Sequence, residues 1–132
     1  MKRIIPVLFA LFLFVGLSSC NKIVENKLDG TYRVDRVFKN GTDNTQSFNT
    51  AFANYKLVLA EGGSYVITWV TFSVQLSQSG HWLVNENGKN IQMTPDNGDP
   101  VANWKIIERK KKSLNVQYAE DGDVYDVQLL KD

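Results

Sequence analysis

The sequence of 132 residues carries 15 Lys and Arg against 14 Asp and Glu, with one Cys and one His. This length leaves room for one domain, and the nearly balanced charge argues against a nucleic-acid binder, which needs clustered Lys and Arg. The single Cys excludes an internal disulfide, and one Cys with one His cannot form a zinc site of such ligands within one chain.

Residues 1–20 have the features of an export signal. Two basic residues precede the apolar stretch from Ile4 to Leu17, which at 14 residues is shorter than the roughly 20 that a membrane-spanning helix needs. The segment ends in Leu17-Ser18-Ser19-Cys20, which resembles the bacterial lipobox, where a peptidase cuts before the Cys and the thiol is acylated. The resemblance implies a signal peptide over residues 1–19 and attachment to the membrane through a lipid on Cys20. The alternative is an uncleaved signal anchor that ends in Cys.

Residues 20–28 have no clean hydrophobic period, and we interpret them as a tether between the lipid and the fold. Asn21 stands where lipoproteins retained at the inner membrane of Gram-negative bacteria tend to carry Asp, which favours the outer membrane. An acidic run, associated with surface export in Bacteroidetes, does not follow the Cys. We therefore expect a bacterial outer membrane lipoprotein that faces the periplasm, with the cell surface as the alternative.

Apolar and polar residues alternate from Gly30 onward, which is typical of half-buried antiparallel strands. The expected strands lie near residues 30–38, 55–60, 64–70, 79–85, 89–94, 102–108, 113–118 and 123–130. Dipeptides that suit tight turns separate several of them, namely Gly62-Gly63, Asn87-Gly88 and Asp121-Gly122. Because most connections are too short for crossovers, we predict an all-β domain over residues 29–132, an eight-stranded antiparallel up-and-down β-barrel. An open β-sandwich is the alternative, and no helix of ten or more residues is expected.

A long polar connection from Asn40 to Asn54 interrupts the alternation. It holds Phe48, Ala51 and Phe52, whose spacing suits one helical turn laid over the barrel mouth, with Ser47 as the candidate N-cap.

A second irregularity lies between Thr71 and Ser79. Phe72, Val74 and Leu76 alternate there in the parity opposite to that of the preceding strand. The switch predicts a bulge or a turn near Val70. The three apolar side chains then either stay in the core or form an exposed rim at the mouth.

Leu28-Asp29-Gly30-Thr31-Tyr32, at the start of the first strand, resembles the Gly-x-Trp signature of lipocalins, with Tyr32 in the aromatic place. Later motifs resemble lipocalin-like lipoproteins of Bacteroidetes: Gly80-His81-Trp82, the hairpin Asn85 to Asn90, Trp104-Lys105-Ile106 and Ser113-Leu114. The resemblance implies an eight-stranded barrel with a cavity for a small apolar molecule. The domain is short for the classical family, so the cavity is either small or filled by side chains. Arg109 is our candidate for the arginine that packs over the signature aromatic residue in that family.

Reactive side chains are scarce. His81 has the parity opposite to Trp82 and is expected on the outer face, and a general base beside Ser79 or Asp96 is the alternative. Acidic turns near residues 96–100 and 120–123 do not match the spacing of a calcium loop, and we interpret them as ordinary turns.

Four consecutive cations, Arg109 to Lys112, separate two of the expected strands. We interpret this run as a solvated hairpin turn, and attraction to anionic lipid headgroups or lipopolysaccharide is the alternative.

These features favour a binding protein over an enzyme. We expect no metal ion, no cofactor and no nucleic-acid partner. The first hypothesis is a lipid-anchored lipocalin-like protein that binds a small hydrophobic ligand in its barrel. The residues expected to line the ligand site are Tyr32, Phe48, Phe52, Trp69, Phe72, Trp82, Trp104 and Tyr118. The second hypothesis is an envelope interaction or assembly module with a filled barrel, whose outer surface docks a partner protein.

Overall fold

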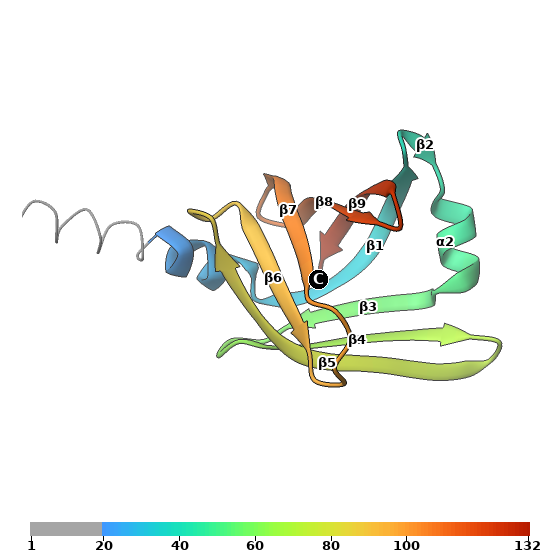
Figure 1. Ribbon diagram of the computed structural model, residues 1–132, viewed down its shortest axis with the longest axis horizontal. Coiled ribbons are helices and arrows are strands. Elements are labelled where there is room, and N and C mark those ends of the chain that lie inside the picture. The colour runs from blue at the N-terminus through green and yellow to red at the C-terminus, as the bar shows by residue number, and fades with distance from the viewer. Residues whose placement is uncertain (1–19) are drawn as a thin grey trace, which may run out of the picture.

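One antiparallel sheet closes on itself to form the fold (Figure 1). The computed structural model describes residues 20–132, so the signal peptide expected over residues 1–19 lies outside the described part. The elements are β1 (Gly30–Lys39), β2 (Thr42–Asp43), α2 (Thr45–Ala51), β3 (Ala53–Leu59), β4 (Ser64–Thr71), β5 (Val74–Asn85), β6 (Asn90–Pro95), β7 (Ala102–Arg109), β8 (Ser113–Glu120) and β9 (Asp123–Lys131).

The strand order confirms the predicted eight-stranded up-and-down barrel. From β3 to β9 each strand pairs with the next, β1 pairs with β3, and the pairing of β1 with β9 closes the barrel. The two-residue β2 is an additional strand on the far side of β1. Closure leaves no open edge among the eight main strands, which excludes the open sandwich.

Up-and-down topology gives the barrel two distinct ends. One end holds the helical residues 20–28 together with the β5–β6 and β7–β8 turns, and we call it the closed end. The other end holds α2 and the β4–β5 and β8–β9 turns, and we call it the mouth (Figure 1).

The segment expected to be a tether is instead helical, over residues 20–28, and it packs on the closed end. The pairing of β5 with β4 ends at His81, and the Trp82 N–H donates to the Gly63 carbonyl oxygen over 2.8 Å. Further along β5 the helix supplies the partner: the Val84 N–H donates to Glu25 Oε1 over 2.9 Å. The Gly88 N–H likewise donates to Asn21 Oδ1 over 2.7 Å, and Leu28 is buried in the core. The sequence did not reveal this helix because its apolar face is too short to produce a recognisable period. No helix within residues 20–132 is long and apolar enough to cross a membrane.

The parity switch after β4 is a two-residue hairpin turn. Phe72 and Ser73 both have positive φ, 51° and 63°, and Thr71 pairs with Val74 across the turn. The switch therefore lies just beyond the predicted position near Val70, at a turn of the kind that requires left-handed residues. The sequence did not predict this turn from Phe72 and Ser73, because Gly or Asn usually occupies such positions. The hairpin extends past the barrel wall, which yields the exposed rim: Phe72 is 96% exposed and Val74 57%.

The helix expected near Phe48 is present as α2, which packs against β1, β3 and β4. The prediction that Ser47 is the N-cap is wrong, because Ser47 lies inside the first turn and Asn44 occupies the cap position. Thr45 fixes the start of the helix instead: its N–H donates to Asp43 Oδ1 over 2.9 Å, and its Oγ1 accepts from the Val37 N–H over 3.0 Å.

Gly80 allows β5 and β6 to approach the ring of Tyr65. The register places Gly80 opposite Tyr65 on one side and opposite Pro95 on the other. An added Cβ would overlap the Thr94 carbonyl oxygen and would lie 2.8 Å from Cε1 of Tyr65.

We therefore expect Gly80→Ala to lower the free energy of unfolding by about 2–3 kcal/mol, because backbone and a buried ring would have to shift. Urea denaturation followed by tryptophan fluorescence measures this loss. Gly98→Ala is the control: its Cβ would meet nothing within 4 Å, and its φ of +86° predicts a loss of only about 1 kcal/mol. Equal losses in the two variants would contradict the close approach at Gly80.

Candidate functional site

Aromatic side chains of α2, β3 and β4 meet at the mouth. The ring centroids of Phe48 and Phe52 lie 5.0 Å apart, and Tyr55 packs edge-on against Phe48 at 5.4 Å. Trp69 of β4 packs edge-on against Phe52 at 6.0 Å. These four side chains form one apolar wall, which joins α2 to the sheet.

A second aromatic group lies on the strands near the β8–β9 turn. Trp104 of β7 stacks on Tyr118 of β8 at 5.9 Å, and Tyr118 stacks on Tyr125 of β9 at 5.3 Å. All three side chains are only partly buried, and they pack against the core. They form a continuous stack of aromatic rings across three neighbouring strands.

Tyrosine hydroxyls give this aromatic mouth its polar groups. Within residues 20–132 the hydroxyls of Tyr55, Tyr118 and Tyr125 take part in no hydrogen bond, and no side-chain N or O atom is fully buried without a partner. These hydroxyls therefore retain access to solvent. Burial, then Glu120 and Tyr125, raises the pKa of Tyr118 to about 12, and burial likewise raises the pKa of Tyr55. Both phenols stay protonated at neutral pH and can donate a hydrogen bond to a polar group of a ligand.

A polar chain connects the barrel interior with the β6–β7 loop. The Tyr65 hydroxyl donates to Gln78 Oε1 over 3.1 Å, and Gln78 Nε2 is 3.5 Å from Asp99 Oδ2. Asn97 Nδ2 donates to the same Asp99 oxygen over 3.0 Å. Burial, then Asp96 and Asp99, raises the pKa of Tyr65.

The expected ligand-lining residues separate into three places. The mouth contains Phe48, Phe52, Trp69, Trp104 and Tyr118. Tyr55 and Tyr125 belong to the same surface and were missed, although each shares the parity of the inward-facing residues of its own strand.

Tyr32 and Trp82 lie in the core, with their polar atoms already paired. Tyr32 is 2% exposed, and its hydroxyl donates to the Leu28 carbonyl oxygen over 2.7 Å. Trp82 Nε1 donates to the Ala60 carbonyl oxygen over 3.0 Å. Phe72 is the opposite case, because it stands exposed at the hairpin tip, where it contributes to the outer surface.

The cation over the Tyr32 ring is Lys131, which corrects the assignment of Arg109 to that place. Lys131 Nζ lies 5.9 Å from the ring centroid and also donates to the Lys27 carbonyl oxygen over 3.1 Å. Burial, then Asp29, raises the pKa of Tyr32 to about 12, and Arg109 acts on it only as a charge that lowers the pKa.

His81 lies on the outer wall, as its parity predicted. Its side chain is 75% exposed, and Nδ1 lies 3.3 Å from Asp96 Oδ1. No group of three or more His, Cys, Asp or Glu side chains within residues 20–132 is arranged to hold a metal ion.

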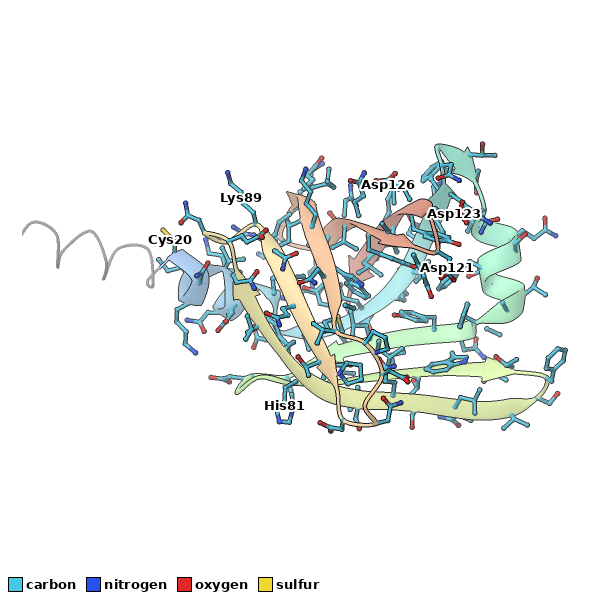
Figure 2. The ribbon with its side chains drawn as sticks, in the orientation of Figure 1. Cys20, His81, Lys89, Asp121, Asp123 and Asp126 are labelled. Atoms are coloured by element: carbon cyan, nitrogen blue, oxygen red, sulfur yellow. The ribbon has the colours of Figure 1, made fainter. Side chains whose placement is uncertain are left out.

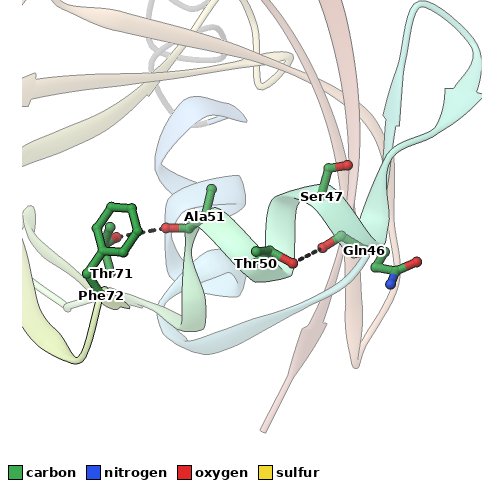
Figure 3. A pocket seen from close by; sticks show the side chains of 6 residues that line it. All are labelled: Gln46, Ser47, Thr50, Ala51, Thr71 and Phe72. Carbon is green, nitrogen blue, oxygen red and sulfur yellow. Dashed lines mark hydrogen bonds between the residues drawn. The ribbon is translucent and has the colours of Figure 1, made fainter.

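A shallow groove of about 540 Å³ runs outside the barrel between α2 and the β4–β5 hairpin (Figure 3). Its lining residues are Gln46, Ser47, Thr50, Ala51, Thr71 and Phe72. The Thr71 hydroxyl donates to the Ala51 carbonyl oxygen over 2.7 Å, which ties the hairpin to the helix. The groove is therefore a surface feature beside the aromatic mouth.

No protein-family model and no curated protein matches this chain. The geometry defines its class as a small eight-stranded up-and-down β-barrel with an aromatic mouth at one end.

Raising the pH above 10 should destabilise the barrel. The pKa values of Tyr32 and Tyr118 are about 12 in the fold, whereas an unfolded tyrosine ionises near 10. Between these values the unfolded state releases protons that the folded state keeps, so the free energy of unfolding falls as the pH rises.

The expected loss is about 1–2 kcal/mol per tyrosine across this window. Urea midpoints measured on both sides of pH 10 check it, and Tyr118→Phe should lose less stability than the wild type over the same range. An equal loss in the two proteins would show that Tyr118 does not contribute.

Proposed function

We propose that this protein binds a small apolar ligand in the mouth of its barrel while a lipid on Cys20 holds it at a bacterial membrane. The observation that supports ligand binding is the partly exposed aromatic surface of Trp104, Tyr118 and Tyr125, with hydroxyls that have no protein partner. Apolar surfaces that remain accessible are typical of binding sites, because burying them provides most of the binding free energy.

The packing of the barrel limits the shape of this ligand. Side chains fill the barrel interior away from the mouth, and Leu57, Ile91 and Leu114 are completely buried there. A long acyl chain would have to displace them at a cost in packing. We therefore favour a compact molecule with a flat ring, which extends the stack at Trp104 or Tyr125 and receives a hydrogen bond from a phenol.

Lipid attachment is compatible with such a site. Cys20 is exposed at the closed end, and the aromatic groups lie at the mouth, so both can be occupied together (Figure 1). We infer the outer membrane from Asn21, and the periplasmic side from the lack of an acidic run after Cys20.

Ligand binding is tested by titrating retinol, palmitate and haem into the protein while following tryptophan fluorescence. Trp69 and Trp104 should report a ligand in the mouth, and buried Trp82 should respond less. We expect the two ring-bearing compounds, retinol and haem, to give saturable changes at lower concentrations than palmitate. Tyr118→Ala should weaken their binding roughly tenfold, since it removes the central ring of the stack.

His81→Ala, on the outer wall, is the matched control and should bind like the wild type. The proposal would be wrong if none of the three compounds gave a saturable response, or if Tyr118→Ala and His81→Ala behaved alike.

A second candidate function is docking of an envelope protein at the hairpin tip. Phe72 combines near-complete exposure with a left-handed backbone, φ 51°, although this conformation is unfavourable for a bulky residue. Val74 and Leu76 extend the same apolar surface. An exposed apolar residue held at a strained turn is a common property of interaction sites.

A photoreactive side chain in place of Ser73 should form one dominant cross-link to a partner in the native envelope. Phe72→Ser should abolish that product, because it removes the largest apolar contact. The same photoreactive group in place of Asn87, in a turn at the closed end, is the control. Identical products from both positions would argue against a docking site at the tip.

A further inference from the structure

Basic side chains gather at the closed end, although the whole chain is nearly neutral. The members of this basic end are Lys22, Lys27, Lys89, Arg109, Lys110, Lys111, Lys112 and Lys131. Backbone contacts hold these segments together: the Lys131 N–H donates to the Lys112 carbonyl oxygen over 2.8 Å, and the Ile106 N–H donates to the Lys89 carbonyl oxygen over 2.9 Å.

The acids at the closed end offset part of this charge. Glu25 accepts from the Val84 N–H and lies 3.8 Å from Lys22, and Glu108 pairs with Lys110 at 3.0 Å. Further acids at this end are Asp29, Glu61, Glu86 and Asp132. Within residues 20–132 neither Lys111 nor Lys112 takes part in a salt bridge, so the β7–β8 turn presents two unpaired positive charges.

The mouth carries the opposite charge. Its acids are Asp43, Glu120, Asp121, Asp123 and Asp126, of which only Asp123 is paired with a cation there, Lys39 at 3.6 Å, within residues 20–132. Figure 2 shows Cys20 and Lys89 at one end of the molecule and Asp121, Asp123 and Asp126 at the other. The barrel therefore has an electrostatic polarity along its length that the net charge conceals.

Cys20 belongs to the basic end and has no flexible linker between it and the barrel. Cys20 is already helical, and Asn21 is fixed by its hydrogen bond to the Gly88 N–H. The carbonyl oxygen of Cys20 lies 3.8 Å from where a Cβ on Gly88 would stand. Ile23, one turn along, is 50% exposed on this helix. A lipid on Cys20 would thus bring the basic turns and Ile23 to the bilayer surface.

We propose that the closed end is a membrane-binding face that rests on an anionic lipid surface, with Lys110, Lys111 and Lys112 against the headgroup phosphates. The inference rests on the proposed lipid attachment at Cys20 but not on ligand binding. A cationic cluster beside a lipid anchor supplies the second attraction that stable membrane binding requires. Repulsion of the acidic end from the same surface directs the mouth and Phe72 away from the membrane. A ligand therefore enters from the aqueous side.

The orientation can be measured on the full, acylated protein reconstituted into vesicles. Once Cys20 is acylated, a cysteine introduced as Asn87→Cys at the closed end or as Asp121→Cys at the mouth carries a single fluorophore. Vesicles of phosphatidylcholine alone are compared with vesicles that also contain phosphatidylglycerol, both with a headgroup quencher. We expect phosphatidylglycerol to increase quenching at position 87 and not at position 121, and high salt to remove the increase.

Charge variants identify the cause. The triple variant Lys110→Gln, Lys111→Gln, Lys112→Gln should lose the increase, because each cation near an anionic leaflet strengthens its attraction roughly fivefold. The control Arg36→Gln, Lys56→Gln, Lys105→Gln removes as many charges from exposed positions on the wall and should keep it. Equal quenching in both kinds of vesicle, or equal effects of the two triple variants, would overturn the membrane-binding face.

The two proposals fail in distinguishable ways. If the protein does not float with vesicles of phosphatidylcholine alone, the lipid on Cys20 is absent and that part of the proposed function is wrong. Salt-sensitive flotation with phosphatidylglycerol vesicles would then still support the basic face. Failure to float with either kind of vesicle would overturn both.

Discussion

The pairing of β1 with β9 is the constraint on which the other features depend. It joins the first and last long strands of the chain and turns a meander into a barrel without open edges. A register shift between Val34 and Arg36 bends β1 so that it can pair with β3 and β9 at once. Once the sheet is closed, every second side chain is forced into one small interior. The inward side chains must fill this interior or lie at one of its two ends. Where the interior is too crowded for any side chain, the position is a glycine, as at Gly80.

The two ends of the barrel differ in how completely they are covered. At the closed end, residues 20–28 cover the interior and supply acceptors for the N–H groups of Val84 and Gly88, which no strand can pair. At the mouth, α2 packs against only part of the rim, and the remaining aromatic residues stay partly accessible. This asymmetry explains why a ligand site is proposed at the mouth and a membrane-binding face at the opposite end. It also places the exposed hairpin tip at Phe72 at the same end of the barrel as the proposed ligand site.

Charge follows the same axis as packing. In an up-and-down barrel, successive turns alternate between the two ends. The short runs Arg109 to Lys112 and Glu120 to Asp123 lie in successive turns and therefore reach opposite ends. A protein held at Cys20 would then present the acidic mouth to the aqueous phase. Under the proposed function, the lipid on Cys20 and the basic turns hold the closed end at the membrane. The aromatic mouth then faces away from the membrane.

The sequence by itself determined the barrel class, the inward side chains and the eight main strands apart from the first part of β5, because alternation is a local property that a closed sheet preserves. The strand expected at residues 79–85 begins at Val74, since the parity switch at residues 72–73 is a turn within a longer hairpin. The same parity placed His81 outside and located Trp69, Trp104 and Tyr118 inside. Only the tertiary structure decided which inward residues fill the core and which line the mouth, since that depends on height along the barrel, where Tyr32 and Trp82 differ from Tyr118. It also decided that residues 20–28 form a docked helix and that basic and acidic turns separate. These outcomes depend on hydrogen bonds and charges between segments far apart in the chain, such as Asn21 with Gly88, and no local pattern records them.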